Sequence, residues 1–400
     1  MTDSNQQSGL SKEQIDSVIA LYTAGQYQEA INQIKILNQS YPNTPFLFNL
    51  IGACYKSLGQ LEGSAKMFET AVNLKPDYAE AHKNLGITLK DLGQLDAAVG
   101  SLSKAIAIDP SYVDAHYNLA ITFKDLNQLD AAVKSYQKVI EINPNFAQAY
   151  NNLGNLMKDL GQADVAIKNY QKAIEINPSF AHAYNNLGST LMSLGRLKES
   201  ILSFEKAISL DPRNILAHNN LGTVLSTLGQ LKAGAKSIEK ALEIDSDFAE
   251  AHNSLGNIYR RLKQREKALL CYERAYAIKP DMNFVLGSLI NIKMHLCIWS
   301  NLESYLEDLT TQIKNNKKVI GSFNLFGLID DSALHRKTTE IRINSAHPRN
   351  TSLPAINPYP RRSKIRIGYF SADFKIHPVT TLTAELYEVH NRECFEIHAF

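Results

Sequence analysis

A repeat of 34 residues is the feature that most constrains the fold of this 400-residue chain. Six phrases of one form, from AEAHKNLG to AEAHNSLG, begin at residues 79, 113, 147, 181, 215 and 249 with no insertion between them. The register extends back through residues 45–78 and, more weakly, through 11–44. Such a period indicates a supersecondary unit that stacks on its copies, because one unit cannot bury its own apolar side. We therefore expect eight units over 11–282, after a polar and disordered segment at 1–10.

Each unit carries the pattern of two short helices when its residues are numbered from residue 79 as position 1. Positions 4, 7, 8 and 11 fall on one stripe of a first helix, and Ala98, Leu102 and Ala105 mark the packing face of a second. The small residue at position 8 should let the two helices approach closely, so Gly154→Leu is expected to cost about 1–3 kcal/mol. Glycine at position 15 indicates a turn, and proline at position 32 ends the unit. The glycines are Gly93, Gly161, Gly195 and Gly229, and the prolines are Pro110, Pro144, Pro178, Pro212 and Pro280.

This period and pattern resemble the tetratricopeptide repeat, a helix–turn–helix unit. The resemblance implies an all-α solenoid, an α-α superhelix, whose degenerate first unit caps one end. It also implies that the partners are proteins or extended peptide segments held in the repeat groove. A homodimer through the outer faces of the repeats is left open.

A row of polar residues on the first helix is the candidate binding surface. Positions 2, 6, 9 and 13 face away from the packing stripe. An asparagine amide both donates and accepts hydrogen bonds, so a row of them can hold a peptide backbone whatever its side chains. The alternative is a solvated polar face copied by duplication. The row comprises Asn84, Asn118, Asn152, Asn186 and Asn220 at position 6, with Asp91, Asp125 and Asp159 at position 13.

Two other kinds of site are disfavoured by the same pattern. The histidines at position 4 occupy the packing stripe and lie a full repeat or more apart, so we expect packing residues and no metal site. Lysine and arginine are absent from positions 2 and 6 of units 79–282, so no basic cradle for a terminal carboxylate is expected there. The histidines are His82, His116, His218 and His252.

The pattern changes after residue 282. Residues 283–346 predict closing helices and a helical connector, with Ser300 and Glu303 as a capping box. Prolines in 347–363 indicate a linker. Residues 364–371 and 395–400 predict two strands around a helix at 381–390, the opening of a parallel α/β sheet. So small a sheet cannot close a core in water, so we expect these residues to be part of a longer protein.

The succession of the repeats, CIWSNLESYLEDL and SKIRIGYFSADFKIHPVTTL resembles the nucleocytoplasmic protein O-GlcNAc transferases and the related SPINDLY-type fucosyltransferases. The resemblance implies that 364–400 opens the first of two Rossmann-like lobes that clasp a nucleotide-sugar. UDP-GlcNAc, or GDP-fucose in SPINDLY types, would then supply a sugar for Ser or Thr of a protein. His377 of the HP pair would lie in the cleft, with Asp373 and Phe374 shaping the loop. The second lobe is missing from these residues, so they alone should be inactive.

Composition and charge exclude several classes of protein. The net charge of +2 gives no basic field for nucleic acid, and no apolar run is long enough to cross a bilayer. The N-terminus has no signal-peptide pattern and no CxxC pair occurs, so we expect a cytoplasmic protein without metal. Three hypotheses stay open: the recognition region of a glycosyltransferase, a non-catalytic scaffold or adaptor, and a truncated product with an unfolded tail. The cysteines are Cys54, Cys271, Cys297 and Cys394.

Overall fold

The computed structural model describes residues 9–321, 324–325, 327–346, 365–369 and 395–399. The chain divides into two units, Met1–Ile341 and Arg342–Phe400. All described secondary structure of the first unit is helical, and the second unit contains the end of one helix and a pair of short strands.

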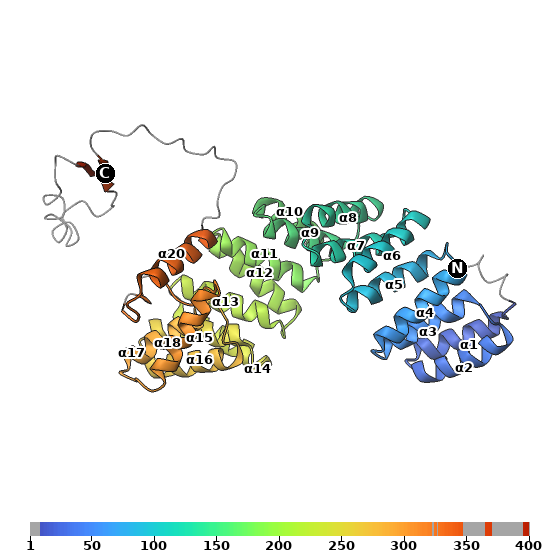
Figure 1. The fold of residues 1–400 in the computed structure, drawn as a ribbon, viewed down its shortest axis with the longest axis horizontal. Coiled ribbons are helices and arrows are strands. Elements are labelled where there is room, and N and C mark those ends of the chain that lie inside the picture. Colours follow the sequence, from blue (N-terminus) through green and yellow to red (C-terminus); the bar gives the residue numbers. More distant parts are fainter. Residues whose placement is uncertain (1–8, 322–323, 326, 347–364, 370–394, 400) are drawn as a thin grey trace. The chain divides into compact units, whose positions relative to one another are not determined.

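Eight pairs of antiparallel helices follow one another along the first unit (Figure 1). Each pair corresponds to one 34-residue unit of the sequence, including the degenerate first one. The pairs are α1 (Lys12–Thr23) with α2 (Tyr27–Ser40), α3 (Pro45–Ser57) with α4 (Leu61–Leu74), α5 (Ala79–Asp91) with α6 (Leu95–Ile108), α7 (Val113–Asp125) with α8 (Leu129–Ile142), α9 (Ala147–Asp159) with α10 (Ala163–Ile176), α11 (Ala181–Ser193) with α12 (Leu197–Leu210), α13 (Ile215–Thr227) with α14 (Leu231–Ile244), and α15 (Ala249–Arg261) with α16 (Arg265–Ile278).

The turn inside each pair is built at position 15. At Gly93 the backbone is left-handed, with φ of 76°. The N–H of Gln94 donates to the carbonyl of Leu89 at 2.9 Å, which closes the end of α5. Asn127 and Lys263 take the same conformation at position 15 of their units, with φ of 58° and 60°. The turn geometry is therefore set by the register of the repeat, and glycine only makes it less strained.

The two helices of a pair meet through the small residue at position 8 and a large residue sixteen positions later. A Cβ atom on Gly154 would lie 2.6 Å from Cε1 of the Tyr170 ring, far inside van der Waals contact. Tyr170 is fully buried, so its ring has no space to withdraw into. This geometry explains why a bulky side chain at Gly154 should overpack the pair.

Tyr170 also makes stability sensitive to alkali. Burial raises the pKa of Tyr170 to about 12. The hydroxyl ionises near pH 10 in an unfolded chain, so unfolding releases a proton between about pH 10 and 12. Stability should therefore be unaffected below this window and fall as pH rises through it. We expect Tyr170→Phe, which copies the natural Phe204 of the next unit, to make the fall shallower in urea melts at about pH 8 and 11. An equally steep fall would show that Tyr170 does not ionise on unfolding.

The described N-terminal residues are better packed than their polarity indicates. Leu10, expected to be disordered, is buried against the first pair of helices. Ser11 caps α1, because its Oγ accepts from the N–H of Gln14 at 3.2 Å while Oε1 of Gln14 accepts from the N–H of Ser11 at 2.9 Å. The boundary of the folded part therefore lies before residue 10, and residues 1–8 are outside the described part.

After the repeats, the described residues include the three helices α17 (Val285–His295), α18 (Leu302–Lys314) and α20 (Ser332–Ala346). The predicted capping box at Ser300 and Glu303 is wrong. Asn301 is the residue before α18, with a left-handed φ of 60°, and no side chain caps the helix. Asparagine tolerates this conformation, so the helix begins one residue later than the box requires. No helix in the described residues is long and apolar enough to cross a membrane.

In the second unit, β1 (Ile365–Tyr369) and β2 (Phe395–Ala399) form a parallel pair. Their register aligns Ile365 with Phe395 and Tyr369 with Ala399. The predicted linker at 347–363, the predicted helix at 381–390 and His377 lie outside the described residues.

Candidate protein-binding face

Consecutive first helices bring the candidate binding residues together. We call the side of these helices that carries positions 2, 6, 9 and 13 the helix-A face. Contacts join α3 to α5, α5 to α7, α11 to α13, and α13 to α15. Position 6 of one unit therefore lies near position 5 of the unit before it.

The position-6 asparagines form a hydrogen-bond ladder between repeats. Four of the five donate from Nδ2 to the residue 35 positions earlier, which occupies position 5 of the preceding unit. All five side chains are half-buried on the helix-A face. The bonds run from Asn84 to Oδ1 of Asn49 at 3.0 Å, from Asn152 to the hydroxyl of Tyr117 at 2.8 Å, from Asn186 to Oδ1 of Asn151 at 3.0 Å, and from Asn220 to Oδ1 of Asn185 at 3.2 Å.

Asn118 is the exception, and its neighbour explains why. Position 5 of the preceding unit is Lys83, whose ammonium has no acceptor to offer. Asn118 instead donates within its own helix, to the carbonyl of Asp114 at 2.8 Å. The ladder therefore depends on an acceptor at position 5 as well as on asparagine at position 6.

The ladder stops at the C-terminal end of the repeats. Ser254 and Ser288 occupy position 6 in the next two units. The side-chain oxygens of Asn219 and Asn253, at position 5 before them, are buried without a hydrogen-bond partner. Serine is too short to replace asparagine as the donor, so the two buried acceptors stay unpaired.

The ladder leaves hydrogen-bonding capacity on the helix-A face. An amide has two N–H donors and an acceptor oxygen, and each of the four ladder asparagines uses one donor in the ladder. Within the described residues, the side-chain oxygens of Asn118, Asn186 and Asn220 accept no hydrogen bond. That of Asn152 accepts from Asn151 at 3.3 Å. The face therefore presents fixed amides with spare acceptors at a regular spacing.

The aspartates at position 13 lie in different environments. Asp91 pairs with Lys56 of the preceding unit at 3.0 Å and with Lys90 at 3.6 Å. Asp125 and Asp159 are exposed and have no ion pair within the described residues. Asp91 thus links two units, while Asp125 and Asp159 remain accessible to a partner.

The position-4 histidines stabilise their own repeat. Each is positioned to donate from Nε2 to the backbone carbonyl six residues earlier, in the turn that precedes its helix. His82 and His116 are buried, and His218 and His252 are half-buried. The bonds reach Pro76 at 2.9 Å, Pro110 at 3.0 Å, Pro212 at 3.1 Å and Ser246 at 2.9 Å.

Models of known protein families match the repeat region of this chain. A model described as TPR repeat matches five overlapping segments across 52–229, and two described as tetratricopeptide repeat match 215–248 and 249–282. Together they span 52–282, more than half of the chain. This chain is a tetratricopeptide-repeat protein. The first tetratricopeptide unit, 11–44, lies outside these matches, but α1 and α2 fold as a pair in the same register.

Solved structures of other proteins are similar to the helical repeats of this chain. A chain of the complex described as the APC/C hetero-tetramer Cut9–Hcn1 is matched with a TM-score of 0.52 and 17% identity, over 70% of this chain and 55% of that one. A tetratricopeptide repeat protein from Parabacteroides merdae is matched with a TM-score of 0.51 and 19% identity, over 62% of this chain and 98% of that one. MamA is matched with a TM-score of 0.39 and 29% identity, over 40% of this chain and 95% of that one. At this identity the first two show a common fold. No curated protein matches the chain.

Proposed function

We propose that this tetratricopeptide solenoid is a protein-interaction scaffold that holds an extended peptide segment along its helix-A face. The ladder of position-6 asparagines carries the proposal. It places amides on successive repeats, each with an N–H and, for most, an acceptor oxygen left for a ligand. A peptide backbone offers the complementary donors and acceptors along its length. Recognition of this kind depends little on the ligand's side chains.

The ladder also prepares the face for binding. A free asparagine loses side-chain freedom when it binds, which weakens association. Asn152 and Asn186 are already held by Tyr117 and Asn151 of the preceding repeat. Their amides are therefore fixed before a ligand arrives, so less entropy is lost on binding.

The same bonds change what a triple substitution would do. Replacing Asn118, Asn152 and Asn186 together by alanine adds helix propensity, because alanine is the better helix former. The loss of the ladder bonds of Asn152 and Asn186 opposes this gain, since it leaves acceptors of the preceding repeat unpaired. We expect each of these two substitutions to cost about 1 kcal/mol of stability.

Asn118 separates binding from stability because it makes no bond to another repeat. We expect Asn118→Ala to weaken binding of an uncharged, extended Ser/Thr-rich peptide by about threefold to tenfold while the thermal midpoint stays within about 1 °C. Asn169→Ala is the matched control. Asn169 makes the same bond inside its helix, to the carbonyl of Val165 at 2.8 Å, but lies on α10, away from the face.

Fluorescence anisotropy of the labelled peptide measures both variants. The proposal requires weaker binding with Asn118→Ala and unchanged binding with Asn169→Ala. Equal affinities for the two variants and the parent chain would remove the asparagine row from the binding surface.

We further propose that the solenoid is the substrate-recognition region of a protein O-glycosyltransferase that uses UDP-GlcNAc. The RIGYFSADFKIHPV stretch supports this, as does the parallel pairing of β1 and β2, the arrangement that opens an α/β sheet. His377 would lie in the active-site cleft. The test is calorimetric titration of UDP-GlcNAc into the protein purified from its own cells, with GDP-fucose as the comparison. Binding of neither nucleotide-sugar would contradict the proposal and leave the scaffold role standing.

A further inference from the structure

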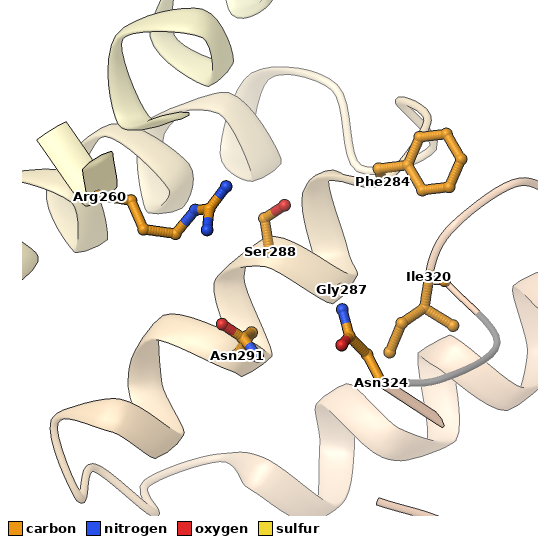
Figure 2. A pocket seen from close by; sticks show the side chains of 8 residues that line it. Arg260, Phe284, Gly287, Ser288, Asn291, Ile320 and Asn324 are labelled. Carbon is orange, nitrogen blue, oxygen red and sulfur yellow. The ribbon is translucent and has the colours of Figure 1, made fainter. Parts of the chain in front are cut away.

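Three adjoining cavities line the exposed side of α17. One of about 130 Å³ lies between Arg260, Ser288 and Asn324 (Figure 2). A second, of about 300 Å³, shares Arg260 and Asn291 with the first, and a third, of about 510 Å³, shares Asn291 and Ile320. Because they share lining residues, they form one depression, which we call the C-terminal groove.

The C-terminal groove continues the helix-A face beyond the last repeat. In the register of the repeats, positions 2, 6, 9 and 13 of α17 and the residue before it are Phe284, Ser288, Asn291 and His295, and all four line the cavities. Ser288 stands where earlier units carry the ladder asparagine. Its shorter side chain leaves Oδ1 of Asn253 unpaired and leaves room for the 130 Å³ cavity.

Unpaired positive charge marks one end of the groove. Arg260, Lys263, Arg265 and His295 line the second cavity together with Asn291 and Ile292. None of the three cations, Arg260, Lys263 and Arg265, forms an ion pair with a described acidic residue. The charge pattern of the repeats changes here, because units 79–146 carry Lys–Asp at positions 12 and 13 and unit 249–282 carries Arg–Arg.

The other end of the groove is apolar. Met294, Ile320 and Leu328 line the third cavity, next to Asn291 and Asn324. The segment of Ile320 is held against α17 by backbone bonds, from the N–H of Phe284 to the carbonyl of Lys318 at 2.7 Å and from Gly287 to Val319 at 3.1 Å. The groove thus presents a cationic end, amides in the middle and an apolar end.

We infer that the C-terminal groove binds an acidic stretch of the extended peptide, with its carboxylates at Arg260, Lys263 and Arg265. This inference rests on the proposed function and adds to it the chemistry of the partner. Arginine guanidinium matches a carboxylate with two parallel hydrogen bonds, and neighbouring cations add to the attraction. An apolar side chain next to the carboxylates fits the cavity of Met294 and Ile320. The helix-A face binds the backbone of the peptide, and the cationic end of the C-terminal groove selects the peptide by its charge.

The test uses two labelled peptides of about 14 residues, the length that spans several repeats in extended form. Both share an uncharged Ser/Thr-rich sequence, and one ends in Glu-Glu-Leu-Glu where the other has Gln-Gln-Leu-Gln. In fluorescence anisotropy, the glutamate peptide is expected to bind about tenfold more tightly, with an advantage that shrinks as salt rises. The triple variant R260Q/K263Q/R265Q should abolish this advantage without changing the affinity of the glutamine peptide.

A second triple variant controls for loss of charge alone. K198Q/K232Q/K236Q removes three exposed lysines of α12 and α14, which lie away from the groove. The inference holds if the control keeps the advantage of the glutamate peptide. Equal binding of the two peptides by the parent chain, or an equal effect of both triple variants, overturns it. If only the glutamate peptide binds, the proposed backbone recognition fails and the charged groove stands.

Discussion

Replacing Gly222 by alanine is expected to destabilise the solenoid by about 2–3 kcal/mol. The added Cβ would lie 2.6 Å from the carbonyl oxygen of Gly234 and would also clash with Cγ1 of Ile238. A side chain can rotate away from such a contact, but the Gly234 carbonyl is part of the backbone of α14. The helices of this pair would have to move apart, at a cost larger than the helix propensity gained, which is about 1 kcal/mol.

Gly100 provides the matched control. It lies on the exposed side of α6, and a Cβ atom there would meet nothing within 4 Å. Gly100→Ala should therefore stabilise the protein by about 0.5–1 kcal/mol, because alanine loses less backbone freedom than glycine in a helix. Urea denaturation followed by circular dichroism measures both changes. A Gly222→Ala midpoint at or above that of the parent chain would show that the close approach of α13 and α14 does not need glycine.

The helix pairs could be predicted from the sequence because every unit repeats the same local rules. A break at position 15, an apolar stripe and a proline at position 32 fix where helices begin and end. The repeat even overrides local preference, since Lys263 takes a left-handed conformation that lysine seldom adopts. At Ser300 there was no repeat to fix the register, and the local capping pattern alone predicted the wrong start for α18.

The asparagine row could be predicted as a surface, but its bonds could not be predicted from position 6 alone. Whether each amide reaches the next repeat depends on position 5 of the unit before it. The sequence holds that signal, because Asn49, Asn151 and Asn185 can accept a hydrogen bond and Lys83 cannot. This signal predicts the bond only when it is known that the first helices of adjacent units are in contact.

The basic end of the C-terminal groove could not be predicted from positions 2 and 6, where a basic cradle for a terminal carboxylate would lie. Arg260, Lys263 and Arg265 come from positions 12, 15 and 17 of the last unit, and His295 beside them comes from position 13 of α17. Residues at positions 12, 15 and 17 surround the turn between α15 and α16, where the chain reverses. Such a cluster is assembled by the turn and by packing of the next helix, so no single helical face reveals it.

A buried ion pair anchors the connector to the last repeat and gives the second large effect. Lys293 of α17 keeps only 7% of its side-chain exposure, and its Nζ lies 3.1 Å from Oε1 of Glu273 on α16. The ammonium also lies over the ring of Tyr305 on α18, 5.6 Å from the ring centre. Three consecutive elements therefore meet at one buried charge. Removing the carboxylate leaves that charge without its partner.

Glu273→Gln is expected to destabilise the protein by about 2 kcal/mol, less than the ~3–5 kcal/mol of a fully buried pair because Glu273 keeps 40% exposure. The exposed pair of Lys172 and Glu175, 2.8 Å apart, gives the control, and Glu175→Gln should leave the free energy of unfolding nearly unchanged. Adding Lys293→Met to Glu273→Gln should recover most of the loss, because the buried charge is then gone. Urea melts of the four proteins measure these differences. Equal effects of the two glutamate substitutions, or no recovery in the double variant, would show that the buried charge does not anchor α17.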